Sequence, residues 1–231
     1  MRHPTPAPPE GLGTVDGLAY ALFHPQGEPR GGIVVVHGAG SRKENHFDFC
    51  RGARAAGFAA VAYDQRGHGD SEGPLDDRLV SDVVTIRGVL PDGPVALRGS
   101  SMGGYVALLA ARPLDAAAVV AICPAGSEHL LRGLRTGDWE WHADVPAIER
   151  FLEAHDLMWE IRALDCPVMF LHAEGDERIP VTHSIALHQL TTAPGRKLVI
   201  LPGGHHRSIQ HDAEMQGEAL RFVDRAFVAA A

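Results

Sequence analysis

Short apolar runs alternate with helix-forming stretches along most of the chain. Runs such as 33–36 are apolar and β-branched throughout, which is typical of strands buried on both faces of a parallel sheet. The predicted strands are 17–24, 32–37, 58–63, 95–98, 116–123, 168–172 and 197–201. The predicted helices are 44–56, 76–90, 104–111, 182–190 and 212–227. This alternation predicts an α/β fold with a doubly wound, mostly parallel sheet.

The turn at 99–103, Gly-Ser-Ser-Met-Gly, lies between a predicted strand and a predicted helix. In that context a G-x-S-x-G sequence is typical of a nucleophile elbow, in which the central residue, Ser101, takes a strained backbone conformation. The residues two positions before and two positions after Ser101 can then carry almost no side chain, and both of them, Gly99 and Gly103, are glycine. The next amide, of Met102, lies at a helix N-terminus and can bind an oxyanion. The alternative is a glycine-rich turn with a capping serine.

The overall composition predicts one globular domain. The chain has 231 residues, of which 45% are hydrophobic and 22% charged. We expect a loose proline-rich leader at 1–14 and a single domain over 15–231. The net charge of −8 argues against a nucleic-acid partner and against an anionic membrane surface. The apolar run 116–123 is too short to span a bilayer, so we expect no stable membrane association.

The cysteines and histidines give no sign of a metal or a disulfide framework. The three cysteines are scattered and form no C-x-x-C pair, which favours free thiols in a reducing cytoplasm, although one disulfide stays possible. The 14 histidines show no spacing typical of metal ligands. We therefore expect no metal and no cofactor.

Polar residues follow several predicted strands at the edge where ligands bind in such sheets. After the strand at 32–37, a glycine turn can aim the Ala39 amide at the elbow, where it would complete an oxyanion hole with the Met102 amide. Asp176 follows the strand at 168–172, and two adjacent histidines follow the strand at 197–201. A serine hydroxyl needs an imidazole to take its proton, and the imidazole needs a carboxylate to orient it. Alternatively, Asp176 caps a helix and the histidines are ordinary loop residues.

Together these motifs resemble the α/β-hydrolase superfamily, and within it the serine esterase, monoacylglycerol-lipase-like and serine-aminopeptidase-like branch. The segments that carry the resemblance are 37–40 (His-Gly-Ala-Gly), 64–71 (Asp-Gln-Arg-Gly-His-Gly-Asp-Ser), the elbow, the Asp176 loop and 203–206 (Gly-Gly-His-His). The resemblance implies a catalytic triad of Ser101, Asp176 and His206, because the family's histidine usually comes three residues after the loop glycine. His205 is the alternative.

Residues 124–163 occupy the place where this family inserts a helical lid. Trp139, Trp141 and Trp159 all fall in this stretch. We expect Trp139 and Trp141 to line the mouth of a substrate pocket and Trp159 to pack the lid onto the body. Two apolar faces are expected to pack partly on the body and partly over an acyl pocket; they carry Leu130, Leu131, Leu134, Ile148, Phe151 and Leu152.

These features predict a serine esterase that cleaves small carboxylic esters, with short to medium acyl groups, through an acyl-enzyme. Cleavage of amides or peptides by the same triad is one alternative. A ligand-binding protein on a hydrolase fold is another, but such proteins usually lose a member of the triad, and all three residue types are present here.

Overall fold

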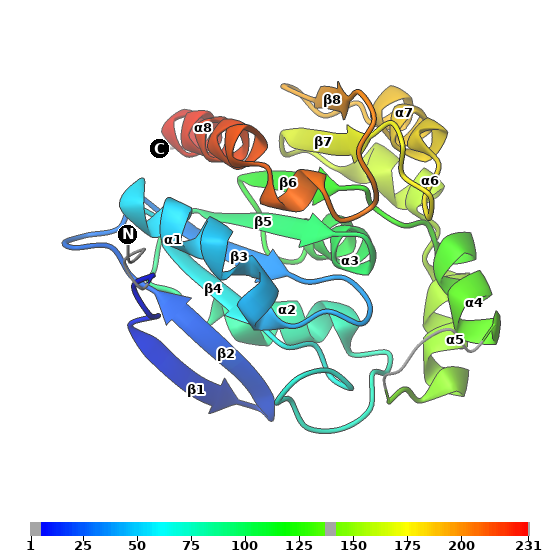
Figure 1. Cartoon of the computed structure of the whole chain (residues 1–231), viewed down its shortest axis with the longest axis horizontal. Helices are drawn as coiled ribbons and strands as arrows, with labels where there is room; N and C mark the ends of the chain where they lie inside the picture. Colours follow the sequence, from blue (N-terminus) through cyan, green and yellow to red (C-terminus); the bar gives the residue numbers. More distant parts are fainter. Residues whose placement is uncertain (1–5, 137–141, 231) are drawn as a thin grey trace, which may run out of the picture.

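The computed structural model describes residues 6–136 and 142–230. Within these residues an eight-stranded sheet has the strand order β1-β2-β4-β3-β5-β6-β7-β8 (Figure 1). The strands are β1 (Gly11–Val15), β2 (Leu18–Phe23), β3 (Gly32–Val36), β4 (Ala59–Tyr63), β5 (Val95–Ser100), β6 (Ala118–Ile122), β7 (Val168–Ala173) and β8 (Lys197–Leu201). β2 pairs antiparallel with β1 and β4, and the pairings from β4 across to β8 are parallel. The predicted α/β fold on a mostly parallel sheet is therefore confirmed.

Helices cover both faces of the sheet and thereby bury its central strands on both sides. The helices of the body are η1 (Lys43–His46), α1 (Phe47–Ala55), α2 (Leu79–Arg87), α3 (Met102–Ala110), α7 (Val181–Leu190), η3 (Ile209–His211) and α8 (Ala213–Ala230). Residues of α1 and α8 pack in one apolar cluster with alternate side chains of the sheet. Residues of α2, α3 and α7 pack in the other cluster (Figure 1). This sandwich fixes the carboxyl ends of the parallel strands at one edge.

The sheet begins earlier than the sequence indicated. β1 (Gly11–Val15) overlaps the end of 1–14, the stretch that we interpreted as a leader, and it pairs with β2. Its side chains alternate between partly buried and exposed, and its sequence, Gly-Leu-Gly-Thr-Val, contains two glycines. An edge strand of this kind has no continuous apolar run, so the pattern that identified the central strands could not reveal it.

The expected lid stretch, 124–163, contains four short helices: α4 (Ser127–Thr136), α5 (Val145–Ala154), α6 (Leu157–Glu160) and η2 (Ile161–Ala163). In Figure 1, α4 and α5 lie beyond the end of the sheet toward which the parallel strands point. Asp144 caps α5, its carboxylate accepting from the Ala147 amide at 3.1 Å. Backbone hydrogen bonds connect this region to the loop after β4: the Leu75 N–H donates to the His142 carbonyl, and the Asp144 N–H donates to the Leu75 carbonyl.

Candidate active site

The backbone at Ser101 has the strained conformation expected of a nucleophile elbow. Ser101 separates β5 from α3 and has φ 55° and ψ −119°. A Cβ atom at Gly99 would lie 1.9 Å from the Gly103 carbonyl oxygen, and one at Gly103 would lie 2.1 Å from the Val36 carbonyl oxygen. The expected requirement for glycine on both sides is therefore confirmed. A non-glycine residue at φ 55° costs free energy, and the surrounding contacts must hold it in place.

Backbone hydrogen bonds supply that support. The Ser101 N–H donates to the Ile122 carbonyl at 2.9 Å, and the Ser101 carbonyl accepts from the amides of Gly104, Tyr105 and Ala125. The neighbouring serine has a different role, because the buried Ser100 hydroxyl donates to Gln210 Oε1 at 2.8 Å. The elbow is thus tied to β6, to its own helix and to the loop that precedes α8.

The loop after β3 packs directly against the elbow. A Cβ atom at Gly38 would lie 3.0 Å from the Ser100 carbonyl oxygen and 3.2 Å from Ser101 Cβ. His37 holds this loop: its Nδ1–H donates to the Gly38 carbonyl at 2.7 Å, and its Nε2 accepts from the Gln65 amide at 2.9 Å. The Ala39 amide donates no hydrogen bond within the described part of the chain.

Met102 is the first residue of α3, so its N–H has no acceptor within the helix. Gly38 and Ala39 share a cavity lining with Ser101. The geometry is consistent with two amides beside the Ser101 side chain, as the sequence predicts for Ala39 and Met102.

Asp176 and His206 form a hydrogen-bonded pair at the ends of β7 and β8. His206 Nδ1 donates to Asp176 Oδ2 at 2.7 Å, and this bond leaves Nε2 as the acceptor nitrogen of a neutral ring. The His206 backbone N–H donates to Glu177 at 3.0 Å, which fixes the loop. His205 is exposed, and its Nδ1 accepts from the Arg207 amide at 3.3 Å. The structure therefore brings His206, and not His205, against Asp176.

Several donors surround the Asp176 carboxylate. Oδ1 accepts from the amides of Arg178 and Ile179 at 2.8 and 2.9 Å. Burial by itself would raise the pKa of Asp176, but hydrogen bonds from two histidines and a backbone amide outweigh this effect and hold the pKa well below its usual range. The group is therefore a carboxylate at neutral pH, and it can orient and stabilise a charged imidazole.

The second of those histidines, His172, was not identified from the sequence. Its side chain is fully buried in β7, and its Nε2 lies 3.4 Å from Asp176 Oδ2. The same nitrogen contacts the Ile179 carbonyl at 3.0 Å, and its Nδ1 contacts the Ser184 hydroxyl at 2.7 Å. The only sequence signal is a histidine in an otherwise apolar strand, four residues before Asp176.

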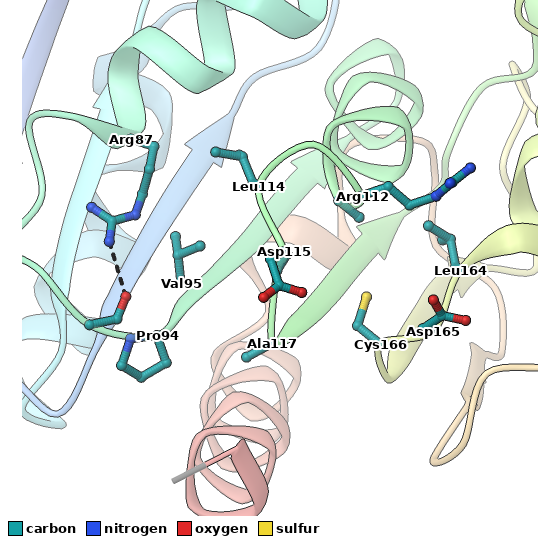
Figure 2. Close-up of a pocket in the computed structure, with 13 residues that line it drawn as sticks. Arg87, Pro94, Val95, Arg112, Leu114, Asp115, Ala117, Leu164, Asp165 and Cys166 are labelled. Carbon is teal, nitrogen blue, oxygen red and sulfur yellow. Dashed lines mark hydrogen bonds between the residues drawn. The ribbon is translucent and has the colours of Figure 1, made fainter.

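A cavity of about 930 Å³ brings Ser101, Asp176 and His206 together at the carboxyl edge of the sheet. Its lining also includes Ala39, Gln210 and residues of α4. A second cavity, of about 650 Å³, lies at the opposite edge, where β5, β6 and β7 begin (Figure 2). That cavity is lined by Arg87, Arg112, Asp115, Asp165 and Cys166 among others and contains none of the predicted site residues.

The expected lid residues have three different outcomes. Trp139 and Trp141 lie outside the described residues. Trp159 is 70% exposed and stacks with the Arg162 guanidinium, so the expectation that it packs the lid onto the body was wrong. The apolar lid residues belong to, or pack against, the apolar cluster that contains α2 and α3, and of these only Leu130 also lines the cavity among the described residues.

In the part of the chain that the structure describes, two clusters of side chains have donor atoms close enough together to ligate a metal. In the first, Cys123 lies beside Asp176 and His206. Burial raises the pKa of the Cys123 thiol, and the other two residues bond to each other, so this donor set fits a metal poorly. In the second, Glu128 Oε1 lies 3.0 Å from His129 Nδ1 and 3.7 Å from His183 Nδ1. The three side chains thus already contact one another directly.

Known proteins resemble the chain in sequence. The family model described as "Serine aminopeptidase, S33" matches residues 27–137. The human monoglyceride lipase is 38% identical over 120 residues, which cover 46% of this chain and 39% of the lipase. The mouse mitochondrial palmitoyl-protein thioesterase ABHD10 is 27% identical over 186 residues, which cover 69% of this chain and 62% of that protein. The chain thus spans less than two thirds of these curated relatives.

A solved structure shares the fold across nearly the whole chain. Est1E of Butyrivibrio proteoclasticus, solved with ferulic acid bound, superposes with a TM-score of 0.73 and 19% sequence identity, covering 95% of this chain and 98% of that one. Identity at this level shows the fold alone. Sheet order, strained elbow and solved structures agree: the chain has the α/β-hydrolase fold, and its sequence is similar to the serine aminopeptidase S33 family model and to monoglyceride lipases.

Proposed function

We propose that the protein is a carboxylic ester hydrolase whose nucleophile is Ser101. The observation that carries the proposal is the convergence, in one cavity, of a serine on a strained elbow and a histidine bonded to a buried carboxylate. The relatives named as a monoglyceride lipase and a palmitoyl-protein thioesterase support acyl transfer to water as the reaction class.

In this mechanism, Ser101 Oγ attacks the acyl carbonyl while His206 Nε2 takes the hydroxyl proton. Asp176 stabilises the resulting imidazolium, and the amides of Ala39 and Met102 donate to the oxyanion. His206 then gives the proton to the leaving alcohol, which departs and leaves an acyl-enzyme. A water molecule, deprotonated by the same imidazole, releases the acid and restores Ser101. No step requires a metal or a cofactor.

The cavity, of about 930 Å³, favours soluble esters with short to medium acyl groups. The three cysteines are free thiols, which favours a reducing compartment such as the cytoplasm. Within the described residues, none of the helices has the length and apolar character needed to cross a bilayer. Amide or peptide cleavage by the same residues is a second candidate, favoured by the description of the matching family model.

A fluorophosphonate probe followed by mass-spectrometric mapping tests the proposal. Ser101 should be the labelled residue, and Ser101→Ala should lower kcat on a short-chain ester by about three orders of magnitude or more, with little effect on folding. Ser100→Ala is the matched control, because the Ser100 hydroxyl is held by Gln210. Labelling at Ser100, or full activity in Ser101→Ala, would contradict the proposal. A parallel panel of aminoacyl amides separates an esterase from a peptidase.

A further inference from the structure

Three arginines line the cavity that holds Ser101. Arg132 comes from α4, and Arg178 and Arg207 follow Asp176 and His206 in the loops after β7 and β8. The guanidinium groups therefore come from both the lid region and the body. All three residues are exposed. Such an arrangement is notable in a chain whose acidic residues outnumber its basic residues, 29 to 21.

Two of these guanidinium groups have no acidic partner among the described residues. Within residues 6–136 and 142–230, the side chains of Arg132 and Arg207 form no hydrogen bond or ion pair. Arg178 lies 3.9 Å from Glu177, and both groups are more than half exposed, so this pair is weak. By contrast, Arg135, on the same helix as Arg132, pairs with Glu149 at 3.1 Å.

The acidic groups of the lining are already engaged. Asp176 accepts from His206 and from backbone amides, and Glu177 accepts from the His206 amide. Polar and charged residues make up 14 of the 21 described residues of the lining, and the apolar ones are Ala39, Ala125, Leu130, Ile179 and Pro180. The described lining is thus mostly polar and carries three guanidinium groups against two carboxylates.

A guanidinium group is suited to a carboxylate, because its planar N–H donors match the two carboxylate oxygens. We propose that the cavity binds esters that also carry a free carboxylate, with Arg132 and Arg207 as the groups that select them. This inference rests on the proposed function and specifies the substrate class of the same site. The carboxylate lies on the acyl part or on the alcohol part of the ester, away from the bond that is cleaved.

Matched substrates test the inference. Monomethyl glutarate has a free carboxylate at the far end, whereas dimethyl glutarate has a second methyl ester there, so its kcat/KM is halved to allow for its two equivalent esters. On the alcohol side, butyryl glycolate carries a carboxylate where ethyl butyrate has a methyl group. We expect kcat/KM for the anionic member of at least one pair to exceed that of the neutral member by about tenfold, mainly through KM. The preference should shrink at 0.5 M added salt, a test concentration at which the Debye length falls to about 4 Å.

Substitution of the arginines tests whether they cause the preference for anionic esters. Arg132→Gln and Arg207→Gln should each lower the anionic-to-neutral ratio about threefold, and Arg132→Glu should bring it to about one or below. Arg135→Gln is the control on the same helix, because Arg135 is absent from the cavity lining, and it should leave the ratio unchanged. Circular dichroism checks that each variant is folded.

The outcomes distinguish this inference from the function on which it rests. If Ser101 is labelled and neutral esters are cleaved as fast as anionic ones in both pairs, the inference is overturned and the esterase proposal stands. The inference is also overturned if the wild-type preference survives unchanged in both glutamine variants and in Arg132→Glu. If Ser101 is not labelled and no ester is cleaved, the proposed function fails and the inference fails with it.

Discussion

Two adjacent histidines illustrate how environment decides chemistry at the scale of one residue. His206 is 7% exposed and bonds to Asp176, whereas His205 is exposed and contacts only nearby loop atoms among the described residues. The Glu177 carboxylate accepts a hydrogen bond from the His206 backbone amide and so contributes to holding this loop in place. A loop with the reverse orientation would leave Asp176 without its imidazole partner.

Substitutions of the two histidines should have very different effects on activity. His206→Ala should reduce kcat by about three orders of magnitude or more, because Ser101 would lose its general base. His205→Ala should retain at least about a third of the wild-type activity, since its ring contacts no predicted catalytic group. Steady-state ester hydrolysis by both purified variants is the measurement. Loss of activity in His205→Ala alone would move the catalytic role to that residue.

At the scale of elements, α5 is attached to the body by an aromatic contact. Phe151 packs edge-on against Tyr105 of α3, with ring centroids 6.5 Å apart, and stacks on His155 at 4.3 Å. The Tyr105 hydroxyl donates to the His155 carbonyl at 2.6 Å. The apolar face of this helix thus anchors the lid region, which leaves less of it to cover an acyl chain than the sequence suggested.

Truncation of this anchor should destabilise the protein. Phe151 is 8% exposed, so Phe151→Ala should lower the free energy of unfolding by about 3 kcal/mol, measured by urea denaturation. Val145 lies on the same helix and is 42% exposed, so Val145→Ala should change the free energy of unfolding by less than about 0.5 kcal/mol. Equal effects of the two substitutions on the free energy of unfolding would contradict the idea that the buried face of α5 stabilises the protein.

At the scale of the whole molecule, buried neutral histidines link stability to pH. Burial, and next the nearby His68 ring, lower the pKa of His37 to about 4, although Asp64 and Glu44 partly oppose this shift. Burial likewise lowers the pKa of His183 to about 4 and that of His46 well below its ordinary value. The hydrogen bonds of His37 agree, because its Nε2 accepts from the Gln65 amide and cannot carry a proton there.

The folded-state pKa of these histidines lies below the unfolded value of about 6.5, so protonation favours the unfolded chain. Stability should therefore be unaffected by these groups above about pH 6.5 and should fall as the pH drops toward 4. At pH 5 the loss should be about 2 kcal/mol from His37 alone. Urea denaturation at pH 7.5 and at pH 5 measures this loss of stability. The His37→Asn variant should show a smaller difference in the free energy of unfolding between the two pH values. A stability that rises toward pH 5 would contradict the prediction.

Local sequence signals predicted the central strands and the elbow for clear physical reasons. A strand buried on both faces must be apolar throughout, and a strained turn at Ser101 requires Gly99 and Gly103. The edge strand β1 gave no such signal, because one side of it is exposed. The contact of His172 with Asp176 was equally hidden, since it depends on the fold of the loop between β7 and α7.

Local sequence patterns were sufficient to predict the α/β sheet, the position of the serine elbow and the strand ends that carry Asp176 and the two histidines. These features depend on local patterns and on the rule that carboxyl ends of parallel strands meet at one edge. Only the tertiary structure decided that His206 faces Asp176, that the apolar lid faces pack mainly on the body, and that Arg132 and Arg207 share a cavity. These facts depend on contacts between segments far apart in the chain, and no local pattern of residues encodes them.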